Sequence, residues 1–274
     1  MGWVKEVGRR GGDEPWRDDF PLDHEIPSSI LIDCRSLELP IHPMFAVRLR
    51  VFIDWHIERG RSVVVEKPQS PAAKAVFDAM GISPRSQPGG EDDTIMPVTR
   101  LTEFPEVEDV AAQTREILEY QLTDVSPLGA AAFMAVSELC ANAIDHGRNS
   151  LGAYAAVRRI SEPRKMVTIA ISDLGVGVPE HIRQRYPEWR EDGWAIAHAT
   201  KENVSGTDDP HRGIGFSAVL EAALTRSLHA AQMDILSANG HCRLGVVQET
   251  DKVEVFPAPR FRRGTWITYD LISV

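Results

Sequence analysis

The feature that most constrains the fold is the stretch Leu128–His146, which has the composition of a buried helix but carries polar groups on one side. Most of its residues are small or apolar, and such residues let a helix pack closely against a sheet. The exceptions are Glu138, Asn142, Asp145 and His146, whose spacing of i, i+4, i+7 and i+8 places them on one helix face. Because these groups are costly to bury alone, that face requires solvent or a ligand opposite it.

The composition indicates a globular protein of one large or two ordinary domains. The chain has 274 residues, 43% of them hydrophobic and 26% charged, with a formal net charge of -10. This charge disfavours an extended surface for DNA or RNA, although a small basic pocket is compatible with it. The N-terminus lacks an apolar signal segment, no uninterrupted apolar run of 18 residues occurs, and the three cysteines are widely spaced. We therefore expect a cytoplasmic protein without disulfides, membrane contact or a zinc site.

Two domains are expected, separated by the turn-rich segment 83–93 (SPRSQPGGEDD). Residues 1–27 are polar and are expected to form a flexible arm. The first domain, 28–88, should contain strands at 28–34 and 61–67 and helices at 44–60 and 70–81. Ser70, Pro71 and Gly81 supply the N-cap, the first position and the stop signal of the last of these helices. A βαβα unit of this kind favours parallel strands.

The second domain, 94–274, is expected to be an α/β sandwich with helices gathered around a mixed sheet. The expected strands are 94–102, 153–160, 167–172, 233–238, 242–248 and 265–271, and the expected helices are 106–122, 128–146 and 216–227. A long polar segment, 178–212, separates the third strand from the last helix.

The segment Ile171–Pro179 (ISDLGVGVP) leaves a strand with Asp173, followed by Gly175 and Gly177. Two glycines one residue apart let the backbone turn tightly and approach a flat ligand. The carboxylate can accept a hydrogen bond from the exocyclic amino group of adenine, where guanine has a carbonyl oxygen. A simple turn between strand and loop explains the same residues, and the motif alone does not separate the two interpretations.

A second glycine pair, Gly213 and Gly215, stands at the start of the helix expected at 216–227. Glycines there expose backbone N–H groups where the helix dipole favours phosphate, and Arg212 adds a charge-assisted contact. The pattern Gly213-x-Gly215-x-x-Ala218 also fits a dinucleotide fingerprint, but the polar stretch before it lacks the strand that this fingerprint requires. The P-loop pattern is absent from the sequence.

The polar helix face is suited to a metal-bound phosphate. Mg²⁺ prefers hard oxygen ligands, and the amide oxygen of Asn142 supplies one without adding negative charge beside a polyphosphate. Glu138, one turn earlier, can accept a proton from an attacking water or hydroxyl. The alternative is a Glu and an Asn that simply face solvent, which the apolar surroundings disfavour.

The chain contains the segments ELCANAIDHG, DLGVGVP, RGIGFS and RGTWITYDL, in this order. Together they resemble the N box, the adenine-binding box, the second glycine box and the terminal glycine–threonine strand of the GHKL ATPase family, whose fold is called the Bergerat or histidine-kinase-like ATPase fold. The resemblance covers residues 94–274 and implies that the protein binds ATP. It implies that Glu138 is the general base or its remnant and that Asn142 is the Mg²⁺ ligand. It further implies an ATP lid at Val178–Arg212 and nucleotide-binding roles for Asp173, Gly175, Gly177, Arg212, Gly213, Gly215 and Thr265.

Within that family, NAIDHG looks like the N box of anti-sigma-factor serine kinases, which are small and stand alone. Histidine kinases carry a phosphoacceptor helix ahead of this domain. Here His24, His42 and His56 lie in or before a βαβα unit, so we do not expect a self-contained histidine kinase. The gyrase, mismatch-repair and chaperone types need a further domain after the ATPase, so we do not expect a chain that stops at Val274 to be one of them.

The segment Ser28–Ile82 is similar to the central part of a STAS domain, the fold of anti-sigma-factor antagonists. In that family a D-S-S-G-like segment at the start of a helix supplies the phosphoacceptor serine. Here Ile41, His42, Pro43 and Met44 occupy the equivalent positions, so the acceptor is missing. The resemblance implies a docking or regulatory module that cannot be phosphorylated at the usual site. A generic small α/β domain remains the alternative.

Two functions remain open. The first is an ATP- and Mg²⁺-dependent serine/threonine protein kinase or ATPase that acts on a separate protein partner. The second is an ATP-gated binding module without phosphotransfer, whose lid and N-terminal domain present or hide a partner surface. The intact Glu138 and NAIDHG favour the first function, and the STAS-like domain without an acceptor favours the second. Both are compatible with a homodimer.

Overall fold

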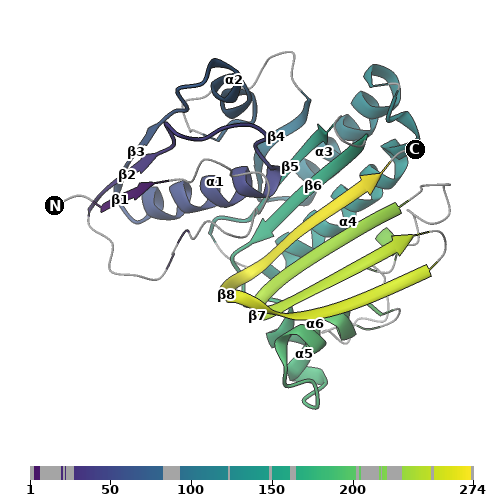
Figure 1. The fold of residues 1–274 in the computed structure, drawn as a ribbon. Helices are drawn as coiled ribbons and strands as arrows, with labels where there is room; N and C mark the ends of the chain where they lie inside the picture. The colour runs from purple at the N-terminus through teal and green to yellow at the C-terminus, as the bar shows by residue number, and fades with distance from the viewer. Residues whose placement is uncertain are drawn as a thin grey trace.

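The computed structural model describes residues 3–6, 20, 22, 28–82, 93–122, 124–147, 150–160, 165–201, 204, 216, 218–220, 230–247 and 250–272. Within these ranges the chain forms a three-stranded parallel sheet near the N-terminus and a larger, five-stranded sheet with helices packed on both faces (Figure 1).

The N-terminal elements are β1 (Trp3–Glu6), β2 (Ser29–Asp33), α1 (Pro43–Glu58), β3 (Ser62–Glu66) and α2 (Pro71–Ala79). Next come β4 (Thr94–Leu101), α3 (Phe104–Glu116), a π-helical turn (Ile117–Gln121), a short 3-10 turn (Ser126–Leu128) and α4 (Gly129–Gly147). The remaining elements are β5 (Ala153–Ile160), β6 (Met166–Asp173), α5 (Val178–Arg185), α6 (Asp192–Ala199), β7 (Ala230–Val247) and β8 (Thr250–Ile272).

The larger sheet has the strand order β4-β5-β6-β8-β7, and each neighbouring pair is antiparallel. The expected α/β sandwich is therefore confirmed, but the sheet is not mixed. Parallel pairing is found instead in the small sheet, where β2 lies between β1 and β3, as the βαβα pattern predicts.

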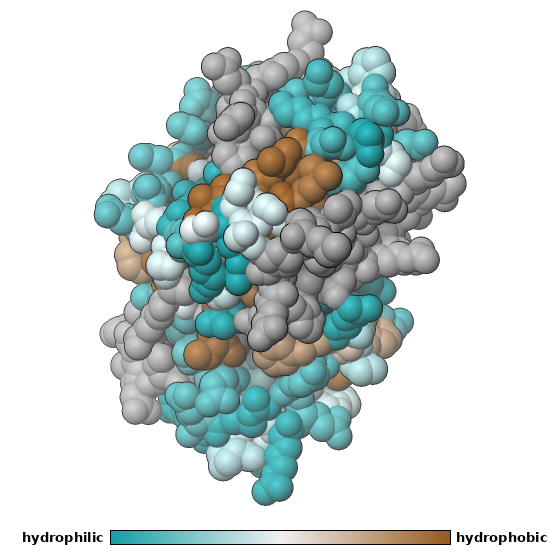
Figure 2. Space-filling view, turned by 90° about the vertical axis from the view of Figure 1, so that its left-hand side faces the viewer, coloured by the Kyte–Doolittle hydropathy of each residue, from teal (hydrophilic) through white to brown (hydrophobic). Residues whose placement is uncertain are grey.

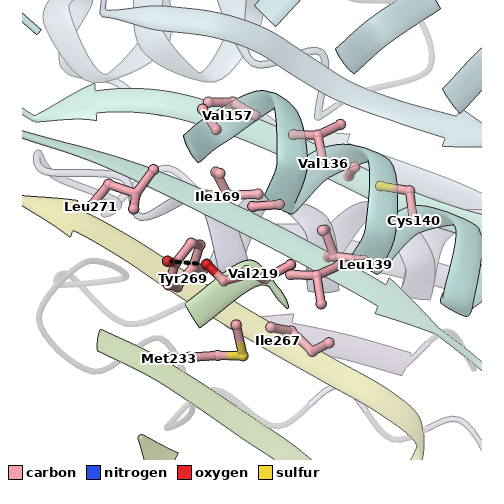
Figure 3. Packing of buried hydrophobic residues seen from close by; sticks show 14 of the residues in the cluster. Val136, Leu139, Cys140, Val157, Ile169, Val219, Met233, Ile267, Tyr269 and Leu271 are labelled. Carbon is pink, nitrogen blue, oxygen red and sulfur yellow. Dashed lines mark hydrogen bonds between the residues drawn. The ribbon is translucent and has the colours of Figure 1, made fainter. Parts of the chain in front are cut away.

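One core lies between the larger sheet and helices α3 and α4. Val136 and Leu139 of α4 belong to the same buried cluster as Ile169 of β6 and Tyr269 of β8 (Figure 3). The Tyr269 hydroxyl donates a hydrogen bond to the carbonyl oxygen of Val219 at 3.2 Å, which ties β8 to the helical segment that contains Val219. The long apolar helix predicted from the sequence thus forms the centre of this core.

A second core lies on the opposite face of the larger sheet, where α1 packs across β5 and β6. Phe45 and Phe52 of α1 share this core with Tyr154, Ala170 and Trp266 of the sheet. Thirteen of the sixteen residues of α1 are buried, so the helix must be covered on more than one side. It lies between the small parallel sheet and the larger sheet. The segment 83–93, predicted as a domain boundary, therefore joins two units that share one hydrophobic core.

Parts of the expected N-terminal arm belong to ordered elements. β1 pairs in parallel with β2, with Trp3 opposite Ile30. The ring of Phe20 lies 6.0 Å from that of Phe45 and 5.5 Å from that of Phe52. The prediction of a flexible arm is wrong at these positions, because isolated apolar residues in a polar stretch gave no periodic signal.

The small sheet leaves part of its outer face exposed. Figure 2 shows the side of the molecule that carries this sheet in Figure 1, with apolar side chains among polar ones. Val64 of β3 is 54% exposed, whereas Ile30 and Ile32 of β2 are buried. Alternate residues of β2 and β3 thus separate an inner face against α1 from an outer face.

The last two strands are longer than the sequence predicted. β7 joins the expected strands 233–238 and 242–248, and its register with β8 shifts between Ser237 and Gly240. Arg243 Nε donates to Asp234 Oδ1 at 2.9 Å, so the two halves of β7 lie side by side (Figure 1). Residues 250–257 of β8, which were not predicted as a strand, pair with the second half of β7.

One helical stretch among the described residues, Ser126–Gly147, is long and apolar enough to cross a membrane by length and composition. It comprises α4 and the turn before it, and α4 contacts α3, β5 and β6. Packing in the core between α3 and the larger sheet accounts for its apolar composition.

The Tyr154→Phe substitution tests the polar contact between the two units. The Tyr154 hydroxyl donates to Asp54 Oδ2 of α1 at 2.8 Å, and Asp54 also accepts a hydrogen bond from Arg50 Nε. Loss of a buried bond to a charged acceptor should lower the free energy of unfolding by about 1–3 kcal/mol in denaturant titrations. The control Tyr120→Phe alters a ring that is 75% exposed and should change the free energy of unfolding by less than about 0.5 kcal/mol. Equal stabilities of the two variants would contradict this role.

Candidate functional site

The turn after β6 holds a buried carboxylate. Asp173 is the last residue of β6 and is only 5% exposed. Its Oδ1 accepts a hydrogen bond from the backbone N–H of Gly175 at 2.7 Å, and the hydroxyl and the backbone N–H of Thr265 also donate to this carboxylate. Burial raises the pKa of Asp173 to about 6, while these hydrogen bonds act in the opposite direction. Donors from two segments far apart in the sequence therefore fix the orientation of the carboxylate.

The same turn lies directly against the end of α4. A Cβ atom added to Gly175 would stand 2.7 Å from the Cα atom of Gly147 and 2.7 Å from the carbonyl oxygen of His146. No residue with a side chain fits there without movement of the backbone. Because α4 rises about 1.5 Å per residue, this contact places the turn about 6–8 Å, along the helix axis, from the level of Asn142.

The polar face of α4 is half-buried, whereas Leu139, Cys140 and Ala143 are buried in the core. Among the described residues, neither the Glu138 carboxylate nor the Asn142 amide has a hydrogen-bond or ion-pair partner. The helix therefore presents an acid and an amide that are held by the backbone and available to a ligand. The shared half-buried face agrees with the sequence spacing, and the roles of the two side chains stay predictions.

Two further glycines and a serine support the turn. Gly177 and Gly264 both have positive φ, 86° and 72°, and a Cβ atom on Gly264 would collide with the backbone of Asp173. Ser237 Oγ donates to the carbonyl oxygen of Gly264 at 2.7 Å and accepts a hydrogen bond from Val178 N at 3.1 Å. The sequence analysis missed Ser237, because its partners come from two other elements and no local pattern marks it.

The described part of the expected ATP lid is folded into two helices. α5 begins at Val178, and the ring of His181 lies 4.8 Å from that of His146 at the end of α4. At the start of α6, Asp192 Oδ2 accepts the backbone N–H of Asn239 at 2.8 Å, which attaches this helix to the bend of β7. The mobility of the segment stays a prediction.

Trp189 and Trp194 of this segment differ in their surroundings. The Trp189 ring stacks on that of His198 at 4.9 Å, so Trp189 packs within this segment. Trp194 is 49% exposed, so packing does not account for it.

Arg212, Gly213 and Gly215, the residues predicted to bind phosphate, lie outside the described residues.

Cys140 lies inside the predicted N box but is not a reactive thiol. Its side chain is fully buried, and burial raises its pKa to about 12. It acts as a small core residue. All three cysteines, Cys34, Cys140 and Cys242, are buried and not in disulfides.

The segment that would hold a STAS phosphoacceptor is buried except for the half-buried His42. His42 is the N-cap of α1, and its Nδ1 accepts a hydrogen bond from the backbone N–H of Met44 at 3.1 Å. Burial, with a further contribution from the nearby Arg158 charge, lowers the pKa of His42 to about 4. Ile41 and Met44 are part of the second core. The start of α1 thus packs against the larger sheet.

A scan against protein-family models finds no match, and no curated protein matches the chain. Among solved structures, the mycobacterial sensor histidine kinase MprB is similar at 14% identity and a TM-score of 0.30, over 65% of this chain and 97% of that chain. The 43K ATPase domain of Thermus thermophilus gyrase B in complex with an aminocoumarin is similar at 20% identity and a TM-score of 0.30, over 58% of this chain and 40% of that chain. The Myxococcus xanthus gyrase B-subunit follows at 11% identity and a TM-score of 0.28, over 53% of this chain and 38% of that chain. At these identities and TM-scores the likeness assigns no function to this chain.

The Gly175→Ala substitution tests the close packing of the turn on α4. The added methyl group meets backbone atoms of His146 and Gly147, which cannot rotate away, so the free energy of unfolding should fall by about 1–3 kcal/mol. The matched control is Gly245→Ala, where no atom lies within 4 Å of the added carbon. Thermal and denaturant unfolding compare the two variants. A Gly175→Ala protein as stable as Gly245→Ala would show that the turn is not held against the helix.

Proposed function

We propose that this chain is a signalling protein that binds Mg-ATP in a GHKL-type site between α4 and the turn after β6. The observation that carries the proposal is the contact of Gly175 with the end of α4, which places the fixed Asp173 carboxylate beside the helix that bears Glu138 and Asn142. In this proposal one site contains a carboxylate that binds the adenine base, an amide that binds the metal ion, and a glycine-rich turn that lies against the flat ring.

Asp173 is suited to recognise adenine. Its carboxylate already accepts hydrogen bonds from Gly175 and Thr265, and it can accept another from an exocyclic amino group. Guanine offers a carbonyl oxygen at the corresponding position, which a carboxylate repels. Gly177 has no Cβ atom, which permits its positive φ and leaves the backbone after the turn without a side chain.

Asn142 and Glu138 would serve the phosphate end of the site. The Asn142 amide oxygen is a ligand that Mg²⁺ accepts without further negative charge, and Arg212, Gly213 and Gly215 are proposed to contact phosphate. The Glu138 carboxylate would take the proton from a hydroxyl or a water. Bound Mg-ATP supplies the phosphoryl group for transfer or hydrolysis.

The activity we favour is that of a serine/threonine protein kinase or ATPase of the anti-sigma-factor type, acting on a separate protein partner. The Glu138 carboxylate, which has no partner among the residues that the structure describes, supports it. An ATP-gated binding module is the second candidate, supported by the burial of Ile41 and Met44 on either side of His42, which leaves the STAS-like unit without an accessible acceptor segment. The net charge of -10 supports a protein partner over a nucleic acid. A cytoplasmic location and a homodimer remain part of the proposal.

The Asp173→Asn substitution tests adenine recognition. Loss of a charge-assisted hydrogen bond should weaken Mg-ATP binding by about 10–100-fold, measured by isothermal titration calorimetry. Because the pKa of Asp173 is about 6, the wild-type affinity should also fall as the pH drops through 6 and the carboxylate becomes protonated. Titration of the nucleotide phosphate affects both proteins equally, so the difference between them reports Asp173. A wild type that gives no heat with Mg-ATP at pH 7.5 would overturn the proposed function.

The Glu138→Ala substitution tests the proton acceptor. With γ-labelled ATP, phosphate release or transfer to a protein in cell lysate should fall by about 100-fold or more, because general-base catalysis contributes about that factor. The affinity for Mg-ATP should stay near the wild-type value. Glu116→Ala, on an exposed position of α3, is the control and should keep full turnover. Unchanged turnover in Glu138→Ala would remove Glu138 from the mechanism, and a wild type that binds ATP without any turnover would favour the gated module.

A further inference from the structure

We propose that Arg263 is a positioning residue through which helix α1 sets the geometry of the nucleotide-binding turn, so that nucleotide binding and the docking of α1 on the sheet are coupled. This inference rests on the proposed function of the site and adds to it a route to the N-terminal unit.

The turn after β6 belongs to two environments at once. Asp173 and Gly175 face the candidate site and the end of α4. The residue between them, Leu174, is 1% exposed and packs in the second core together with α1. A movement of the second core therefore displaces Leu174, the residue between Asp173 and Gly175.

Arg263 of β8 bridges the turn and α1. Its Nε donates a hydrogen bond to the carbonyl oxygen of Leu174 at 3.2 Å. The Cζ atom of the same guanidinium lies 5.1 Å from the centre of the Trp55 ring of α1, a cation–π distance. Trp55 is itself fixed, because its Nε1 donates to the carbonyl oxygen of Leu22 at 3.0 Å. One charged group thus contacts both the backbone of the turn and the side of the helix.

The segment that carries Arg263 is held in place by close contacts. The carbonyl oxygen of Arg263 accepts a hydrogen bond from Trp266 Nε1 at 2.9 Å, and Trp266 lies in the second core. The next residue, Gly264, has a φ of 72° and lies so close to Asp173 and Leu174 that a Cβ atom would overlap their backbone. The residue after that is Thr265, a donor to Asp173. A displacement of Arg263 is therefore transmitted to Asp173, which is proposed to bind adenine, and to Thr265, which donates to Asp173.

Coupling of this kind is reciprocal. If α1 in its docked position favours the geometry that binds nucleotide, then bound nucleotide favours the docked position of α1 by the same factor. The N-terminal unit would thereby respond to the occupancy of a site that it does not enter.

The experiment compares Arg263→Ala with the matched control Arg260→Ala, an exposed arginine three positions earlier on the same strand. The dissociation constant for Mg-ADP, measured by calorimetry on the full chain, should rise about fivefold or more in Arg263→Ala and stay unchanged in Arg260→Ala. Arg263→Lys, which keeps a cation for Trp55 and a donor for Leu174, should restore part of the affinity. Trp55→Leu should weaken binding as well, and the double variant should be no weaker than the worse single variant.

Hydrogen exchange gives a readout that a purely structural role would not move. In the wild type, saturating Mg-ADP should slow amide exchange in α1, and in Arg263→Ala this nucleotide-dependent protection should be lost even at saturation. Additive effects of the two substitutions, or equal protection of α1 in both proteins, would overturn the coupling while leaving ATP binding intact. Absence of nucleotide binding by the wild type would instead overturn the proposed function, and the coupling with it.

Discussion

The contact between Gly175 and the backbone at the end of α4 is the constraint on which the candidate site depends. It joins the end of β6 at Asp173 to α4, whose Glu138 and Asn142 side chains have no partner within the described part of the chain. Because the contact is made by backbone atoms on both sides, side-chain rotation cannot relieve it. The distance between the buried carboxylate and the polar face of α4 is therefore set by main-chain geometry, which is how a site is held rigid.

The larger sheet explains why this rigid site is also connected to the N-terminal unit. Its two faces bury two separate clusters, one against α3 and α4 and the other against α1. The strands alternate between the faces, so Ile171 packs toward α4 while Leu174, three residues later and past the end of the strand, packs toward α1. The turn that carries Asp173 stands where these two cores meet. Residues that stabilise the second core thus also support the turn that carries Asp173.

Much of the fold could be predicted from periodicity and end signals. The strand 153–160 has the bounds that the sequence suggested, and the helix predicted at 70–81 is found at Pro71–Ala79, because residue propensities and end signals are local properties. The extension of β8 back to Thr250 could not be predicted. Its first half, which includes Pro257 and Pro259, is stabilised by pairing with β7 rather than by its own composition.

The sequence by itself determined which residues are chemically able to form a site: the helix spacing of Glu138 and Asn142, and the aspartate followed by two glycines. These follow from covalent order and from the fixed periods of helix and strand. Only the tertiary structure decided that Gly264 lies against the backbone of Asp173, that Ser237 supports Gly264, and that α1 covers the second face of the sheet. Such contacts join residues far apart in the chain, and they depend on how buried area is shared among all elements at once, which no local pattern records.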